Sequence, residues 1–204
     1  AKRIAQKNGE YVGSTAPYGY CVEKINGIYK LIVEPESAKI VRRIFEEYAS
    51  GDGIQSIIDR LFEDGVHRIS DYNQYHHVYC QDGENLHQWG NSSIRAVLNR
   101  NNYYGDLVQR KYESRFQRGE KWCDILDQSQ WIITPNAHEP IISRELFEKA
   151  QVRLKAAQQK ATKTTVGWEE DERAFYNVLY CGDCKRKMCT RRYRGNVYYF
   201  CNAA

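Results

Sequence analysis

The spacing of three cysteines near the end of the chain constrains its fold more than any other feature. Cys181 and Cys184 are separated by two residues, and Cys201 follows after a further short stretch. Two thiolates at this spacing form a tight knuckle that presents both sulfurs to one tetrahedral zinc ion, and a Cys after a hairpin supplies a third ligand. The sequence therefore predicts a zinc-ribbon-like fold in which Cys181, Cys184 and Cys201 bind zinc.

Positive charge is concentrated between these cysteines. Six of the ten residues from 185 to 194 are Lys or Arg, and none is acidic. Because a rigid hairpin with so many cations suits a polyanion, we expect them to contact the phosphates of a nucleic acid; a solvated surface is the alternative. The six cations are Lys185, Arg186, Lys187, Arg191, Arg192 and Arg194.

Composition is typical of a folded chain and excludes several other classes. Of the 204 residues, 42% are hydrophobic and 27% are charged. The sequence contains no apolar run long enough to span a membrane and no signal-peptide pattern. Seven irregularly spaced cysteines argue against a disulfide framework and favour a reducing, cytoplasmic location. Because the chain begins with Ala and ends three residues after Cys201, we expect it to be a piece of a longer protein.

Short-range patterns predict mixed helices and strands before the cysteines. A first helix is expected to end at Asn8-Gly9, and two strands are expected on either side of the hairpin dipeptide Asn26-Gly27. Apolar residues recur at helical spacing over residues 35–49 and again from Ile54 to Phe62, so two amphipathic helices are expected there. They are joined by a short glycine turn, which fits either a helix-turn-helix or a plain packed hairpin.

The second half of this region is less regular. Residues 66–90 show no clear period and are predicted to be a long loop or insertion. A short helix is expected after Asn91, strands near residues 105–112 and 131–133, and a helix of about 20 residues, or about 30 Å, starting at Ser143. The predicted fold class is α+β. A mixed helical and β domain spans residues 1–165, and the long helix joins it to a small zinc-ribbon-like domain at residues 168–204.

Several motifs, taken in order, resemble one family. The order in which they occur along nearly the whole chain is more specific than any motif alone. The chain resembles the C-terminal region of large serine recombinases, the integrases and transposon recombinases of mobile elements. The motifs are Gly9 to Gly13 leading to Pro17-Tyr18-Gly19-Tyr20, the paired helices ending at Asp64-Gly65-Val66, Trp89 to Gly105, His138 to Phe147, and the Cys181 knuckle followed by the aromatic run to Cys201.

This resemblance implies a role in DNA integration or excision. Family members join DNA through a serine in an N-terminal catalytic domain that this chain lacks, so no catalytic residue is assigned here. Double-stranded DNA at attachment half-sites is the implied partner, with dimers and tetramers formed by the full-length protein. The implied zinc ribbon has a fourth Cys beyond Ala204. Expected DNA contacts outside the ribbon are Lys2, Arg3 and Lys7 in a basic linker (residues 1–13), and Arg95, Arg100, Arg110 and Lys111 around a helix–strand junction.

Two alternatives stay open at the level of the sequence. The first is a regulator or RNA-binding module that uses the zinc ribbon alone, without recombinase activity. The second is a protein-interaction domain in which the ribbon supports self-assembly. A second metal site at His76, His77, Cys80 and His87 is disfavoured, because adjacent side chains on an extended chain point in opposite directions.

Overall fold

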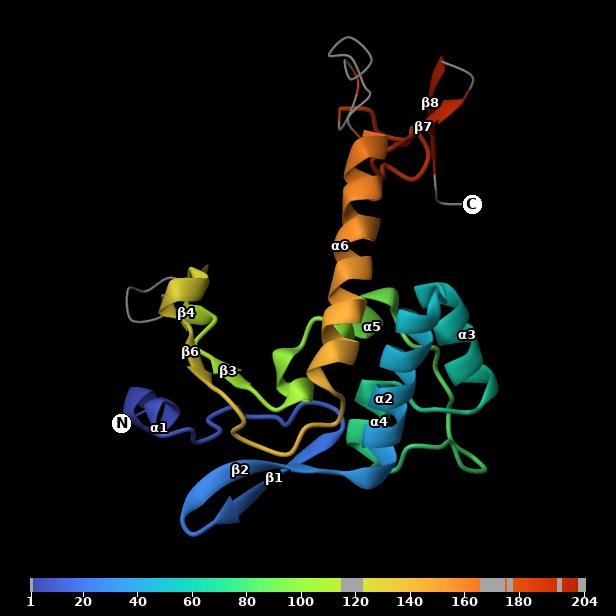
Figure 1. The fold of residues 1–204 in the computed structure, drawn as a ribbon. Helices are drawn as coiled ribbons and strands as arrows, with labels where there is room; N and C mark the ends of the chain where they lie inside the picture. The colour runs from blue at the N-terminus through green and yellow to red at the C-terminus, as the bar shows by residue number, and fades with distance from the viewer. Residues whose placement is uncertain (1, 115–122, 166–174, 176–177, 194–195, 202–204) are drawn as a thin grey trace. The chain divides into compact units, whose positions relative to one another are not determined.

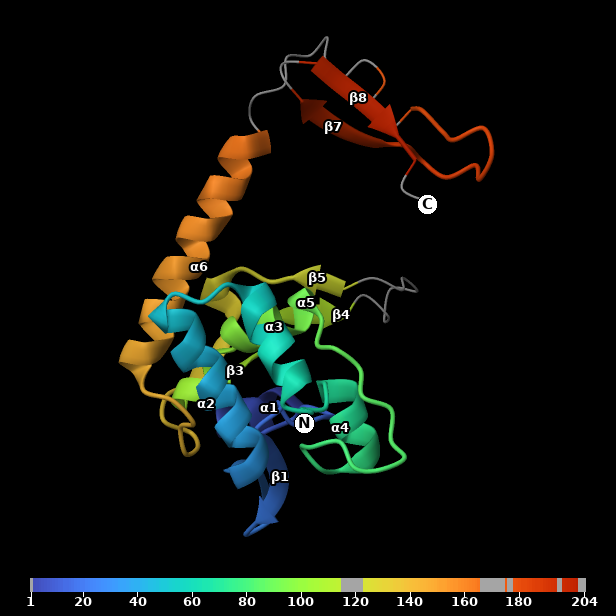
Figure 2. The same ribbon diagram turned by 90° about the vertical axis from the view of Figure 1, so that its right-hand side faces the viewer.

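The computed structural model describes residues 2–114, 123–165, 175, 178–193 and 196–201. By compactness these divide into two units, residues 1–154 and 155–204, and the division falls within the helix α6. Figures 1 and 2 show the elements from two sides. The helices are α1 (Lys2–Lys7), α2 (Pro35–Ser50), α3 (Ile54–Glu63), α4 (Ile69–Tyr75), α5 (Asn91–Leu98) and α6 (Arg144–Thr165), with 3-10 turns η1 (Asn101–Tyr104) and η3 (Gln128–Gln130).

The strands form four separate antiparallel pairs among the described residues. They are β1 (Tyr20–Ile25) with β2 (Ile28–Val33), β3 (Leu107–Gln109) with β6 (Ile132–Thr134), β4 (Tyr112–Ser114) with β5 (Cys123–Ile125), and β7 (Cys189–Tyr193) with β8 (Asn196–Phe200). The predicted mixture of helices and strands is therefore confirmed.

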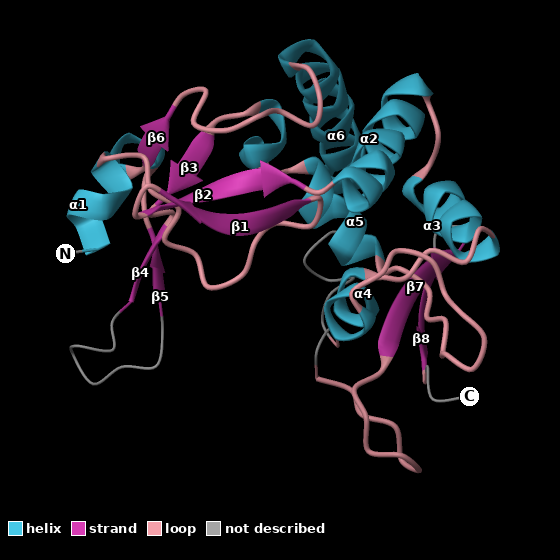
Figure 3. Ribbon diagram, turned by 90° about the horizontal axis from the view of Figure 1, so that it is seen from below, coloured by secondary structure: helices cyan, strands magenta, loops and turns pink. Residues whose placement is uncertain are grey.

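Helices and strands occupy different sides of the first unit. Figures 1 and 3 show α2, α3, α4 and α5 gathered on one side, with α1 and the pairs formed by β3 to β6 on the other. The β1–β2 hairpin turns through Asn26 and Gly27, with φ of 51° and 84°. These left-handed conformations suit the twist of a two-residue hairpin, which confirms the predicted turn.

The core of the first unit lies where the helices meet. The apolar faces predicted for α2 and α3 are buried, and α5 and the start of α6 complete the cluster. Phe62 was expected on the buried face of α3 but is 41% exposed, because it lies one position past the stripe that ends at Leu61. The buried helical side chains include Ile40, Val41, Ile44, Phe45, Tyr48, Ile54, Ile57, Ile58, Leu61, Ile94, Val97, Leu98, Phe147, Ala150 and Leu154.

Buried tyrosines join the hairpin to this core. The rings of Tyr20 and Tyr103 stack with centroids 6.1 Å apart. The Tyr20 hydroxyl donates to the carbonyl of Glu139 over 2.9 Å, and the Tyr103 hydroxyl donates to the carbonyl of Tyr18 over 2.9 Å. Each ring is therefore packed at one end and hydrogen-bonded at the other, as a buried tyrosine requires.

Residues 66–90, predicted to be a long loop or insertion, contain regular structure that the sequence did not indicate. This segment contains α4 and an antiparallel bridge between Val66 and Tyr79, and its side chains Val66, Val78 and Trp89 are buried. Ile69 and Tyr72, three residues apart in α4, pack against the core, but a helix of seven residues is too short for its apolar spacing to stand out in the sequence. Their packing helps to hold the segment in place.

Smaller differences concern element boundaries. The single strand expected over residues 105–112 is interrupted at Arg110, which adopts a φ of 57° between β3 and β4. Cys123 is exposed on β5. At α6 the prediction holds, because Ser143 Oγ accepts a hydrogen bond from the Leu146 N–H at 3.2 Å and caps the helix. No helix in the described part of the chain has both the length and the apolar character needed to cross a bilayer.

Candidate nucleic-acid interface

A cleft of about 760 Å³ lies on the first unit, and basic side chains from distant parts of the sequence line it. Arg3 comes from α1, Arg100 follows α5, and Arg110 and Lys111 connect β3 to β4. All of these were predicted to contact DNA. The structure therefore brings these cations to one surface.

Gln109 holds the N-terminal segment against this cleft. Its side-chain Nε2 donates to the carbonyl of Glu10 over 2.8 Å, and its Oε1 accepts from the N–H of Val12 over 3.2 Å. The amide of this buried residue thus pairs with backbone groups on both sides of Tyr11. The result is that the segment after α1 is fixed beside β3.

The electrostatics of the cleft favour an anion. Among its described lining residues the acidic one is Glu113, which pairs with Arg3 at 2.7 Å and with Arg110 at 3.4 Å. Desolvation, followed by the nearby charge of Arg100, lowers the pKa of Lys111. Its Nζ also lies 4.9 Å from the centre of the Trp131 ring. The repulsion between cations this close together is reduced when a phosphate binds between them.

Other cations predicted to bind DNA lie outside the cleft. Lys7 is exposed on α1, and Arg95 is exposed on α5, where its Nε donates to Asn91 Oδ1 at 2.8 Å. Lys2 lies in α1, but its side chain is not among those described. Their assignment to DNA contact stays a prediction.

Tyrosines in the cleft were missed by sequence reasoning. Tyr11 and Tyr112 line it, and Tyr112 is 62% exposed. The signal available in the sequence was the unusual number of tyrosines, 16 in all, and the position of Tyr112 directly after two cations. Exposed aromatic rings beside cations supply stacking surfaces for bases or sugars.

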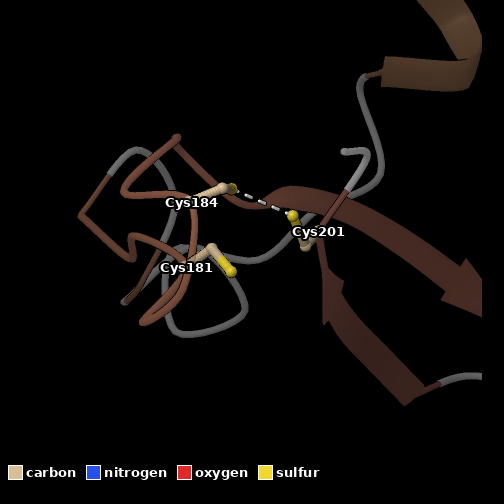
Figure 4. A group of neighbouring side chains, drawn as sticks. All are labelled: Cys181, Cys184 and Cys201. Atoms are coloured by element: carbon tan, nitrogen blue, oxygen red, sulfur yellow. Dashed lines mark hydrogen bonds between the residues drawn. The ribbon is translucent and has the colours of Figure 1, made fainter. Parts of the chain in front are cut away.

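The three predicted zinc ligands converge in the second unit. Figure 4 shows Cys181, Cys184 and Cys201 directed toward one another, and their sulfur atoms all lie within 4.8 Å. The sulfurs of Cys184 and Cys201 are 3.4 Å apart. Zinc–sulfur bonds of about 2.3 Å place two sulfurs of a tetrahedral site about 3.8 Å apart, so a small expansion would fit the ion. The three cysteines are therefore compatible with a metal site.

The backbone around Cys181 favours thiolate chemistry. The Cys181 N–H donates to the Arg186 carbonyl over 2.8 Å, and the Lys185 N–H donates to the Cys181 carbonyl over 3.0 Å. This turn directs the N–H groups of Cys184 and Asp183 toward the Cys181 sulfur. Together with the neighbouring thiols of Cys201 and Cys184, they lower the pKa of Cys181 to about 7. A substantial fraction is therefore ionised at neutral pH, as metal binding requires.

The β7–β8 hairpin displays both cations and aromatic rings. Lys185, Arg186 and Lys187 are exposed before it, and Arg191 is exposed opposite Tyr198. Arg192 lies in β7 without a described side chain, and Arg194 lies outside the described residues.

The aromatic residues of β8 lie on both faces of the hairpin. Tyr198 is 50% exposed and Phe200 is 41% exposed. Tyr199 points to the other face, where its ring meets Phe175 edge-on at 6.2 Å. The alternation of a two-sided hairpin places only every second residue against the rest of the unit.

The four residues considered for a second metal site do not form one cluster among the described residues. His87 pairs instead with Asp71 at 2.9 Å, and His76 ends α4 in a left-handed conformation. His77 does join a group of potential ligands, but its neighbours are His67 and Glu84. No short motif indicates this group, because His67 and Glu84 are 17 residues apart and α4 lies between the two histidines.

Comparison with known proteins identifies the family. A model of the family described as Recombinase matches residues 35–157. The chain belongs to this family. The match covers α2 to the middle of α6, and thus the helical core and the strands around the cleft. The resemblance inferred from the ordered motifs is confirmed at this level.

Solved structures similar to this recombinase-family chain were also found. One comes from work on the sequence requirements of the Listeria innocua prophage attP site, with 18% identity and a TM-score of 0.48 over 97% of this chain and 68% of that chain. Another is the crystal structure of an LSR–DNA complex, with 18% identity and a TM-score of 0.48 over 97% of this chain and 50% of that chain. The assignment to the family depends on the sequence match, not on these two structures.

Proposed function

We propose that this chain is the DNA-binding portion of a site-specific serine recombinase and that it recognises attachment half-sites during integration or excision. The observation that carries the proposal is the convergence of Arg3, Arg100, Arg110 and Lys111 on one cleft in a member of the Recombinase family. Phosphate contacts from such cations fix a protein on the duplex, and Arg side chains can also read guanine edges.

In this proposal the second unit is a zinc ribbon. Cys181, Cys184 and Cys201 would hold the ion together with a fourth ligand, and the metal would stiffen the knuckle from which Lys185, Arg186 and Lys187 project. Binding energy at such a site contributes directly to folding. The role of the metal is therefore structural. The cations of the second unit are proposed to bind phosphates.

Duplex binding tests the function directly. The chain is titrated with a labelled duplex that carries the attachment site of its own mobile element, and with a scrambled duplex of equal length and composition. We expect tighter binding to the attachment site at physiological salt. Equal affinities for the two duplexes would contradict the proposal.

Salt dependence tests the contribution of the ribbon. If the six cations between residues 185 and 194 each neutralise one phosphate, replacing all six by Gln lowers the slope of log affinity against log salt by about five, at about 0.9 per phosphate. Circular dichroism of the variant controls for folding. A slope equal to that of the unmodified chain would mean that these cations face solvent in the complex.

One observation favours a second function. The exposed rings of Tyr198 and Phe200 lie beside the ribbon cations, an arrangement suited to stacking on unpaired bases. The alternative is a zinc-ribbon module that binds single-stranded nucleic acid without taking part in recombination. Competition between duplex DNA and single-stranded RNA of the same sequence separates the two, since preference for the RNA supports the alternative.

A further inference from the structure

A cluster of two imidazoles and one carboxylate lies in the segment that the sequence did not explain. His67 follows α3 and is fully buried, His77 follows α4, and Glu84 lies in the next loop. The Nε2 atoms of His67 and His77 lie 3.0 Å and 2.9 Å from the same oxygen, Oε2 of Glu84. The three potential ligand atoms all lie within 4.8 Å of one another.

The carboxylate is held in place by its own loop. The N–H of Gln81 donates to Oε2 of Glu84 over 2.9 Å, and Gly83, with φ of 86°, turns the chain between them. The carboxylate is therefore oriented by a second contact from its own loop, which is how metal-binding carboxylates are supported.

The distances match the dimensions of a metal site. Zinc binds imidazole nitrogen and carboxylate oxygen at about 2.0–2.2 Å, so neighbouring ligand atoms in a tetrahedral site are about 3.3 Å apart. The separations of 2.9 Å and 3.0 Å in the cluster need to widen by only a few tenths of an ångström. Two imidazoles and one carboxylate form a donor set that first-row transition metals occupy.

Hydrogen bonding alone explains the cluster less well. Without a metal, one oxygen of Glu84 accepts from both imidazoles and from the Gln81 N–H, and both rings must carry a proton on Nε2. The other ring nitrogen of His67, Nδ1, is buried and has no hydrogen-bond partner among the described residues. In this arrangement Glu84 fixes the proton of His67 on Nε2, and an ion bound at Nε2 would shift that proton to Nδ1.

We propose that His67, His77 and Glu84 bind a divalent transition-metal ion such as Zn²⁺ as a site separate from the cysteine cluster. The ion links the end of α3, the end of α4 and the loop after it. Val66 and Val78, both buried, lie directly beside the two histidines in sequence. The metal would thus hold residues 66–84 against the helical core, and His77 is the most exposed of the three ligands.

Zinc titration of the full chain tests this site. Calorimetry with zinc chloride counts the ions bound by the unmodified chain, by Glu84→Gln and by His77→Asn. The matched control is His76→Asn, which removes the adjacent histidine outside the cluster and suits its left-handed backbone. We expect Glu84→Gln and His77→Asn each to bind one ion fewer than the unmodified chain, and His76→Asn to bind the same number.

Equal zinc counts in all four proteins would overturn the proposal. It would also be overturned if His76→Asn lost one ion like the two cluster variants. Cobalt absorption separates the two sites, because thiolate-to-metal bands report only the cysteines and should be unchanged in Glu84→Gln. If that variant fails to fold, crystals of the unmodified chain grown with zinc supply the test. An anomalous peak about 2.0–2.1 Å from both Nε2 atoms supports the site, and peaks confined to the cysteines contradict it.

Discussion

At the scale of single residues, the most informative side chains are those that connect distant segments. Gln109 satisfies backbone groups on either side of Tyr11, and Asp71 joins Arg68 to His87. Such polar contacts fix irregular chain as firmly as apolar packing fixes a helix, because leaving a buried partner unsatisfied is costly. Removing one of these contacts is therefore expected to destabilise the fold, even where the partner residue lies at the surface.

Arg100 supplies a test of the cleft. We expect Arg100→Ala to weaken binding to the attachment-site duplex and to lower the salt slope by about 0.9, the value for one phosphate contact. Fluorescence anisotropy at several salt concentrations measures both quantities. The control is Lys39→Ala on α2, whose cation pairs with Glu36 outside the cleft. The same loss in both variants would mean that the cleft has no special role.

Asp71 gives a pH-dependent prediction. Desolvation of this buried carboxylate opposes the shift, but hydrogen bonds from His87 and Arg68 outweigh it and lower the pKa of Asp71. A carboxylate with a lowered folded-state pKa stabilises the fold above its ordinary pKa of about 3.9, and the benefit disappears as the pH falls through the lowered value. Asp71→Asn should therefore cost about 1–3 kcal/mol of unfolding free energy at pH 6.

The measurement is urea unfolding of Asp71→Asn and of the unmodified chain at pH 6 and at pH 3. The gap between them should narrow at the lower pH. Asp82→Asn, which changes an exposed residue in the neighbouring loop, is the control and should change stability little at either pH. A gap that is independent of pH would assign the loss to packing and not to charge.

At the scale of elements, α6 is anchored to the turn between α2 and α3 by a single side chain. The guanidinium of Arg153 donates to the carbonyls of Tyr48, Gly51 and Asp52, the last at 2.7 Å. It also lies 4.5 Å from the centre of the Tyr48 ring. Arg153 thus pairs with a carbonyl in the last turn of α2 and with two carbonyls of the turn that follows it.

Removing this anchor should destabilise the first unit. Arg153→Met keeps an apolar stem but loses the hydrogen bonds, so we expect a loss of about 1–3 kcal/mol in unfolding free energy. Fluorescence of the buried Trp89 during urea unfolding reports the change. Arg153→Lys, with its charge but not its planar fork, should recover only part of the loss. Full stability in Arg153→Met would show that helix packing alone holds α6.

The elements also show what the sequence could predict. The faces of α2, α3 and α5 follow from apolar spacing, and the β1–β2 turn follows from Asn26-Gly27, because local chemistry determines both. The segment 66–90 could not be predicted in this way, since Asp71 and Glu84 order it through contacts with His87 and His67, 16 and 17 residues away, which no helical or strand period encodes. The cleft depends on Arg3 meeting β4 through Glu113, a contact that no local pattern encodes.

At the scale of the whole molecule, the two units depend on different forces. The first unit has an extended apolar core. In the second unit, which begins at Lys155, none of the described side chains is fully buried. A small domain of this kind requires a cross-link or a metal to be stable. The cysteine cluster is therefore expected to supply most of the stability of the β7–β8 hairpin.

Metal removal tests this difference. After treatment with a chelator, hydrogen exchange should become fast at the amides of β7 and β8, while the amides of α2 stay protected. Mass spectrometry of peptic peptides measures both regions in one sample, so α2 is an internal control. Restored protection of the hairpin on adding zinc completes the prediction. Unchanged exchange in β7 and β8 would mean that the hairpin folds without metal.

The short distance between the sulfurs of Cys184 and Cys201 matters for anyone who purifies the protein. Thiols 3.4 Å apart are readily joined by an oxidant, and a sulfur locked in a disulfide no longer offers a thiolate to a metal. If the cysteine cluster binds zinc as proposed, a sample prepared in air would lose that metal site through oxidation during handling. Preparation under a phosphine reductant, with free thiols counted before each assay, keeps the chain in the form on which its architecture depends.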